Sequence, residues 1–147
     1  MEALIGTELQ TKSGEIVATS QALAGKKIIG LYYSGHYCPP CRKLTPRFAN
    51  LYDAIKEGND DVEIVFVSSD KEVAKFDEYY EEMPWLALPY AKRELYLELR
   101  EKFGVKYVPT IIFFNDKGEI IEREGREFIE EHVDDVDAVL GHLRQKL

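Results

Sequence analysis

The sequence predicts an α/β domain in which helices cover both faces of a mixed central β-sheet. An unbroken apolar run at residues 28–33 and a second run at residues 62–67, apolar except for Glu63, alternate with segments of helical periodicity. Such runs are typical of strands buried on both faces, and strand–helix–strand units imply parallel pairing with right-handed crossovers. A hairpin signal at residues 115–118 (NDKG) adds antiparallel strands near the end of the chain, so the sheet should be mixed.

The elements follow in order along the chain. A turn at residues 11–14 separates two short candidate strands, which would form an N-terminal β extension, and residues 20–25 look like one helical turn. The remaining expected elements are a strand at 28–33, a helix from Cys38 to about Gly58, a strand at 62–67, helices at 71–82 and about 92–102, strands at 110–114 and 119–121, and one final helix carrying Val133, Val136, Val139, Leu140 and Leu143. Residues 83–89 are expected to be a stiff apolar connection.

Apolar residues at intervals of three or four predict the helices. In the first long helix these residues are Leu44, Phe48, Leu51, Tyr52 and Ile55. Pro46 lies within that helix, removes one backbone hydrogen bond and should kink it. In the next helix the inward residues are Val73, Phe76 and Tyr80. Ser69 or Asp70 is the expected cap of that helix, and Gly104 should stop the one after it.

Length and composition restrict the class of protein. The chain has 147 residues, 45% hydrophobic and 31% charged, as expected of one globular domain spanning residues 1–147. Its net charge of −8 argues against nucleic-acid binding and against attraction to anionic membranes. The sequence shows neither a membrane span nor a secretory signal. We expect a monomer located in the cytosol, with the nucleus as an alternative.

Cys38 and Cys41 are the only cysteines, and they follow a buried strand at the predicted start of a helix. Free N–H groups and the positive end of the helix dipole stabilise a thiolate there. Pro39 suits the first helical turn, and Arg42 and Lys43 add positive potential. Because this setting is typical of disulfide exchange, we predict that Cys38 attacks a disulfide and that Cys41 resolves the mixed disulfide.

Other interpretations of the cysteine pair stay open. A structural zinc ion needs four ligands, yet there is no second CxxC, and His132 and His142 are poorly spaced to join His36. A buried structural pair of cysteines is the other alternative, although the proline after Cys38 fits exchange better. We expect no metal and no organic cofactor, so an external reductant must regenerate the dithiol.

Several segments occur here in the same order as in one known family. They are residues 36–42 (HYCPPCR), 63–70 (EIVFVSSD), 83–90 (MPWLALPY), 108–110 (VPT) and 118–121 (GEII), followed by Gly125 and Arg126. Over about residues 4–143 the chain resembles the tryparedoxin/nucleoredoxin group of the thioredoxin superfamily, and most of all the nucleoredoxin-like proteins. The resemblance implies a thioredoxin fold, with Cys38 as the nucleophile and Cys41 as the resolving thiol.

The resemblance also implies a substrate-binding surface made by Tyr37, Pro39, Val108 and Pro109. The Val108–Pro109 peptide bond would be cis and would face the cysteines, and the Val108 backbone would pair with a bound substrate strand. From sequence alone only about 5–6% of such bonds are cis. The other interpretation of Pro109 is a plain strand-entry proline.

The chain departs from the family pattern at three positions. Tyr37 stands where the group usually has tryptophan, and Ser69 stands where tryparedoxins have tryptophan. Tyr32 occupies a position that is acidic in ordinary thioredoxins, so water or another group must move protons there. Trp85 could flank the active site but is expected in the core. His36 could tune the thiolate or lie in solvent.

The expected function is that of a protein-disulfide reductase. The reduced Cys38/Cys41 pair would donate two electrons to a disulfide in another protein and would end as a Cys38–Cys41 disulfide. The expected partners are therefore disulfide-containing proteins and an upstream reductant, either a thiol or a reductase. The alternative is a redox-dependent signalling adaptor with little turnover.

Overall fold

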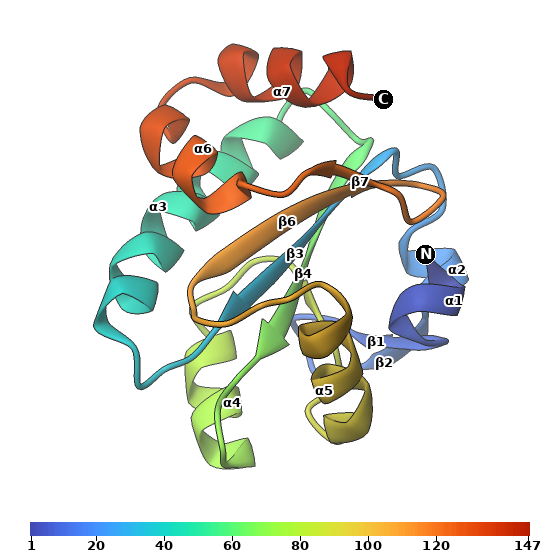
Figure 1. Ribbon diagram of the computed structural model, residues 1–147, viewed down its shortest axis with the longest axis vertical. Coiled ribbons are helices and arrows are strands. Elements are labelled where there is room, and N and C mark those ends of the chain that lie inside the picture. Colours follow the sequence, from blue (N-terminus) through green and yellow to red (C-terminus); the bar gives the residue numbers. More distant parts are fainter.

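A computed structural model describes residues 1–147 and contains a seven-stranded mixed sheet between two layers of helices (Figure 1). The strand order is β2-β1-β5-β4-β3-β6-β7. The strands are β1 (Glu8–Gln10), β2 (Ile16–Ala18), β3 (Ile28–Ser34), β4 (Val62–Ser68), β5 (Leu86–Ala87), β6 (Thr110–Asn115) and β7 (Ile120–Glu122). The helices are α1 (Glu2–Ile5), α2 (Thr19–Ala22), α3 (Pro39–Lys56), α4 (Val73–Tyr80), α5 (Arg93–Lys102), α6 (Gly125–His132) and α7 (Val136–Gln145).

Strand β3 lies in the interior of the sheet, parallel to β4 on one side and antiparallel to β6 on the other. Because successive side chains of a strand point to opposite faces, Ile28 and Tyr32 enter one core, and Ile29, Leu31 and Tyr33 enter the other. All seven residues of β3 and all seven of β4 are buried. The prediction of two strands covered on both faces is therefore confirmed.

The helices divide between the two cores. Helices α3, α4, α6 and α7 contribute to the larger core, whereas α1 and α5 contribute to the smaller one. Figure 1 shows α3, α6 and α7 together on one side of the sheet and α1 and α5 on the other. Trp85 is 1% exposed in the larger core, where its ring contacts the rings of Tyr32, Phe48 and Tyr52. This confirms that Trp85 is a core residue.

The N-terminal extension is a hairpin that joins the main sheet. Strand β1 pairs antiparallel with β2, and Gln10 of β1 also pairs with Ala87 of β5. Two side-chain hydrogen bonds also attach the hairpin to the C-terminal end of α4. The Tyr80 hydroxyl donates to the Gln10 carbonyl at 3.1 Å, and Lys12 Nζ donates to the Glu81 carbonyl at 2.6 Å. The predicted β extension is therefore present and forms one end of the seven-stranded order.

Some local predictions were wrong. The apolar connection at 83–89 contains β5, because pairing with both β4 and β1 holds Leu86 and Ala87 extended. The single C-terminal helix is two helices, and α7 begins where the Asp135 carboxylate accepts a hydrogen bond from the Ala138 N–H. Residues 2–5 form α1, which was not predicted.

Helix α4 also differs from its prediction. It begins after Glu72 rather than at Ser69 or Asp70, and no side chain caps it. Val73 is 56% exposed rather than inward, whereas Phe76 and Tyr80 are buried as predicted. The cap prediction was wrong because the Asp70 carboxylate instead accepts hydrogen bonds from the His36 backbone N–H and from Ser68 Oγ.

None of the helices combines the length and the apolar character that crossing a membrane requires.

Candidate active site

The two cysteines lie beyond the C-terminal end of the interior strand β3. The loop after β3, the start of α3 and the start of β6 meet there, because Tyr33 near the end of β3 pairs with Thr110 at the start of β6 (Figure 1). Cys38 is the N-cap residue of α3, and Pro39 opens the helix, as the sequence predicts. The fold therefore brings residues 38–41 and the segment before β6 together across about 70 residues of sequence.

Cys38 lies where a thiolate would be stabilised. Its Sγ accepts a hydrogen bond from the Cys41 backbone N–H at 3.4 Å, and it lies 3.7 Å from the Val108 carbonyl oxygen. The free N–H groups and the dipole of the 18-residue helix α3 add positive potential at this end. Both cysteines are free thiols, and Cys38 is 8% exposed whereas Cys41 is fully buried. Cys38 is therefore the more accessible of the two thiols.

Cys41 has a different environment from Cys38. Burial, and next the hydrogen bond with Cys38, raise the pKa of the Cys41 thiol well above its ordinary value. Ser34 and the Gly35 backbone offset this rise only in part. Cys41 therefore carries its proton at neutral pH.

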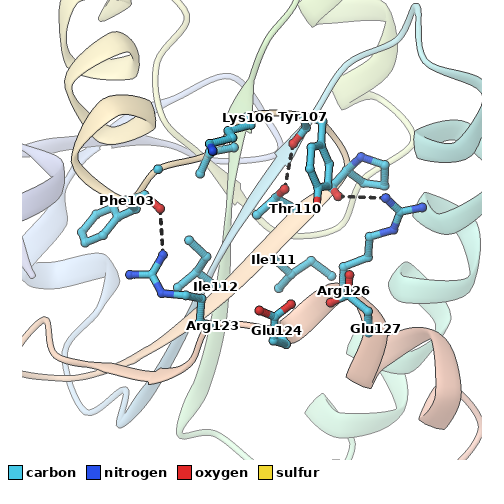
Figure 2. Close-up of a pocket in the computed structure, with 13 residues that line it drawn as sticks. Phe103, Lys106, Tyr107, Thr110, Ile111, Ile112, Arg123, Glu124, Arg126 and Glu127 are labelled. Atoms are coloured by element: carbon cyan, nitrogen blue, oxygen red, sulfur yellow. Dashed lines mark hydrogen bonds between the residues drawn. The ribbon is translucent and has the colours of Figure 1, made fainter.

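The Val108–Pro109 bond is cis and faces Cys38. Figure 2 shows the region behind this segment, where two arginines hold the loop that carries it. The Arg126 guanidinium donates to the Pro109 carbonyl at 3.5 Å, and the Arg123 guanidinium donates to the Phe103 carbonyl at 2.8 Å. Both ends of the loop before β6 are thus fixed to the chain after β7.

A groove of about 390 Å³ opens beside Cys38. Its lining includes Tyr37, Pro39 and Val108, three of the four residues predicted to bind substrate. Pro109 is buried behind them rather than in the groove. Tyr107, which the sequence analysis did not identify, also lines the groove and is 65% exposed. The signal in the sequence that could have identified Tyr107 is an aromatic residue two positions before the predicted cis-proline.

A buried network of hydroxyl groups lies under the cysteines, in place of a carboxylate. The Thr45 hydroxyl donates to the Cys41 carbonyl at 3.0 Å, so it accepts from Tyr32 at 2.7 Å and from Tyr79 at 2.5 Å. The Tyr79 hydroxyl also contacts Ser34 Oγ at 2.7 Å. Burial raises the pKa of Tyr32 to about 12, so its hydroxyl stays protonated at neutral pH.

The network should matter for stability as well as for the position of Cys41. Replacing Thr45 by valine keeps the side-chain shape but removes the acceptor that Tyr32 and Tyr79 share. We expect Thr45→Val to lower the free energy of unfolding by roughly 2 kcal/mol, because buried polar groups lose partners. Thr45→Ser keeps the hydroxyl and is the matched control, with a smaller loss of about 1 kcal/mol for one methyl group. Urea unfolding measures both, and equal losses would contradict the assigned role.

Asp70 fixes the loop that leads to the cysteines. It is 4% exposed, and its carboxylate accepts from the His36 backbone N–H at 2.8 Å and from Ser68 Oγ at 3.0 Å. The His36 side chain is 21% exposed and packs edge-on against Tyr79. This role of Asp70 could not be predicted from the sequence, because His36 is 34 residues away and donates from its backbone N–H.

No group of three or more His, Cys, Asp and Glu side chains is placed to hold a metal ion.

Comparison with known proteins gives consistent matches. Residues 25–120 match the model of the family described as Thioredoxin-like. Nucleoredoxin of Mus musculus is 42% identical over 107 residues, covering 73% of this chain and 24% of its own length, so this chain spans about a quarter of that relative. Tryparedoxin of Trypanosoma brucei brucei is 41% identical over 129 residues, covering 87% of each chain. The crystal structure of native tryparedoxin I from Crithidia fasciculata superposes with a TM-score of 0.80 at 33% identity, covering 88% of each chain.

Proposed function

Because this chain belongs to the thioredoxin-like family of oxidoreductases, within the tryparedoxin and nucleoredoxin group, we propose that it reduces disulfides in other proteins with Cys38 and Cys41. The thioredoxin fold itself is confirmed by the tryparedoxin structure. The observation that best supports the reaction is the position of Cys38 Sγ, which lies at the start of α3 and faces the Val108 carbonyl beside an open groove.

In the first step the Cys38 thiolate attacks one sulfur of the substrate disulfide. The substrate S–S bond breaks as the Cys38–substrate bond forms, and the departing substrate thiolate takes a proton from solvent. The Cys41 N–H and the helix dipole stabilise the thiolate before attack. The groove formed by Tyr37, Pro39 and Val108 holds the segment that carries the disulfide.

In the second step Cys41 loses its proton and attacks Cys38 Sγ. The mixed disulfide breaks, a Cys38–Cys41 disulfide forms, and the second substrate sulfur leaves as a thiolate that takes up a proton. Two electrons have then passed from the protein to the substrate; of the two protons that the substrate sulfurs take up, the one lost by Cys41 balances one, and solvent supplies the other. An external dithiol or a reductase returns two electrons to begin another cycle.

Insulin reduction in the presence of a dithiol reductant tests this function. We expect the protein to accelerate insulin precipitation over reductant alone. Alkylation of the native protein followed by mass spectrometry should label Cys38 much faster than Cys41, which is fully buried. An inert Cys38, or turnover equal to that of the reductant alone, would contradict the proposal; partner binding without turnover would favour the adaptor alternative.

Resolution of the mixed disulfide should depend on pH. Since burial raises the pKa of Cys41, only a small fraction is thiolate near neutrality, and this fraction rises about tenfold per pH unit below the pKa. With an aromatic disulfide as substrate, the release of the first thiolate reports attack by Cys38, and release of the second reports resolution by Cys41.

We expect the rate of the second release to rise roughly 100-fold between about pH 7 and pH 9. The Cys41→Ser variant, which cannot resolve, is the control and should lack this phase. A second phase that does not change with pH would show that Cys41 is already ionised in the mixed disulfide.

We also propose that residues 1–147 form a single domain. The observation that supports this is that all seven strands belong to one sheet. A monomeric state and a cytosolic location, with the nucleus as the alternative, are part of the same proposal. A sizing column and microscopy of the tagged protein would test them.

A further inference from the structure

We propose that the face around Cys38 selects protein segments in which acidic residues flank the reactive disulfide. This inference rests on the proposed disulfide-reductase function and adds the chemical class of its substrate. It follows from the distribution of charge, because the surface around Cys38 is cationic although the chain as a whole carries a charge of −8.

Two hollows adjoin each other at the exposed ring of Tyr37. One, of about 640 Å³, is lined by His36, Tyr37, Arg42, Asp70, Lys71, Glu72 and Lys75. The other is the groove of about 390 Å³ beside Cys38, and its lining includes Arg100 and Lys106. We call the five basic residues of these two hollows, Arg42, Lys71, Lys75, Arg100 and Lys106, the cationic rim. The rim therefore lies on both sides of the reactive sulfur.

Acidic side chains are few in these hollows. The chain has 27 Asp and Glu against 19 Lys and Arg, yet the hollows hold five basic residues and only two acidic ones. Asp70 is buried and its carboxylate is occupied by His36 and Ser68. Glu72 is thus the single exposed acid that lines either hollow.

Most of the rim cations are available to a partner. Arg42, Lys71 and Lys106 are exposed and form no ion pair. Lys75 is paired only with Glu78, at 3.6 Å in an exposed pair of the kind that contributes little. Arg100 donates from Nε to the Val105 carbonyl and remains exposed. A partner carboxylate would therefore meet these charges without displacing strong ion pairs.

Exposed aromatic rings complete the surface. Tyr37 is 62% exposed and Tyr107 is 65% exposed, and both line the groove with Cys38. Figure 2 shows Lys106 next to Tyr107 on the loop that leads to Thr110 at the start of β6. Tyrosine rings give a flat contact with a polar tip, which suits a peptide segment more than a bare ion. A segment held between the rings would place its flanking residues over the cationic rim.

Charge complementarity should act mainly on the rate of association. Oppositely charged surfaces raise association rates by about 10- to 1,000-fold, and salt screens the effect. We expect a disulfide peptide with Asp and Glu flanks to be reduced at least about tenfold faster at low salt than the same peptide with Asn and Gln flanks. A peptide with Lys flanks should be slower still, and the three rates should converge at high salt.

Matched charge variants locate the effect. Lys71→Gln/Lys106→Gln removes two rim charges, and Lys27→Gln/Lys117→Gln removes two exposed charges that line neither hollow. The two proteins have the same net charge. In single-turnover reduction of the peptides by the full chain, the rim variant should lose most of the preference for acidic flanks, and the control should keep it. Equal rates for acidic and neutral peptides, or an equal loss of preference in the control, would overturn the inference.

Measurements of peptide binding distinguish a failure of the cationic rim from a failure of the proposed reductase activity. If the protein reduces none of the peptides, the reductase proposal fails, and fluorescence anisotropy with labelled peptides still decides the question of charge. Tighter binding of the acidic peptide to the wild type and the control than to the rim variant would support the cationic rim. Equal binding to all three proteins would overturn it.

Discussion

Replacing Cys38 by serine is expected to reduce insulin reduction to the level of the reductant alone. The Cys38 sulfur makes the first bond to the substrate, and a serine hydroxyl does not attack disulfides under these conditions. The replacement should leave the fold intact, because serine can still accept the N-cap hydrogen bond from the Cys41 N–H. Circular dichroism and the urea midpoint check this, so that lost activity is not confused with unfolding.

Cys41→Ser is expected to fail at a different point. Cys38 can still attack, but nothing resolves the product, so the protein should accumulate a mixed disulfide with its substrate. Non-reducing electrophoresis and mass spectrometry would detect this adduct at Cys38, and the Cys38→Ser variant should show none. Turnover by either variant comparable with the wild type would refute the assigned roles of the two thiols.

A large loss of stability is expected from Gly125→Ala. Gly125 begins α6 directly against β6, and a Cβ there would collide with the Ile111 carbonyl oxygen and lie 3.0 Å from its carbon. The obstacle is backbone of a central strand, which cannot move without disturbing its pairing with β3. We expect the free energy of unfolding to fall by roughly 3 kcal/mol, as in overpacked cores.

Gly141→Ala provides the matched control. Gly141 lies in the middle of α7, is exposed, and has open space where a Cβ would be. Alanine at such a position in a helix should stabilise by about 0.5–1 kcal/mol. The same chemical change should therefore have opposite signs at the two positions in urea unfolding. A neutral Gly125→Ala would show that α6 can move away from β6.

The sequence predicted the elements whose signal is strong and local. Residues 28–33 are apolar throughout and form most of β3, and residues 62–67, apolar except for Glu63, form most of β4. Five spaced apolar residues face the core from α3. Both cysteines are where the motif places them, at the first turn of α3. The cis bond at Val108–Pro109 is present, but the family resemblance rather than the residues predicted it.

The features that were not predicted depend on contacts between residues distant in sequence. Strand β5 has two residues and exists because β4 and β1 pair with it on either side. Asp70 was predicted as a helix cap, but its carboxylate accepts a hydrogen bond from the His36 backbone N–H instead. The support of Cys41 by Thr45 and Tyr79 could not be predicted, because periodicity treats both simply as buried residues.

The N-terminal hairpin determines which strand lies at this end of the sheet. Strand β5 is only two residues long and pairs with β1 through Gln10 and Ala87, so without β1 that side of β5 would present unpaired N–H and C=O groups. Open strand edges of this kind recruit strands from other molecules and lead to aggregates. Because β1 and β2 extend the sheet, the outermost strand at this end is β2 rather than β5, at the opposite end of the strand order from β7.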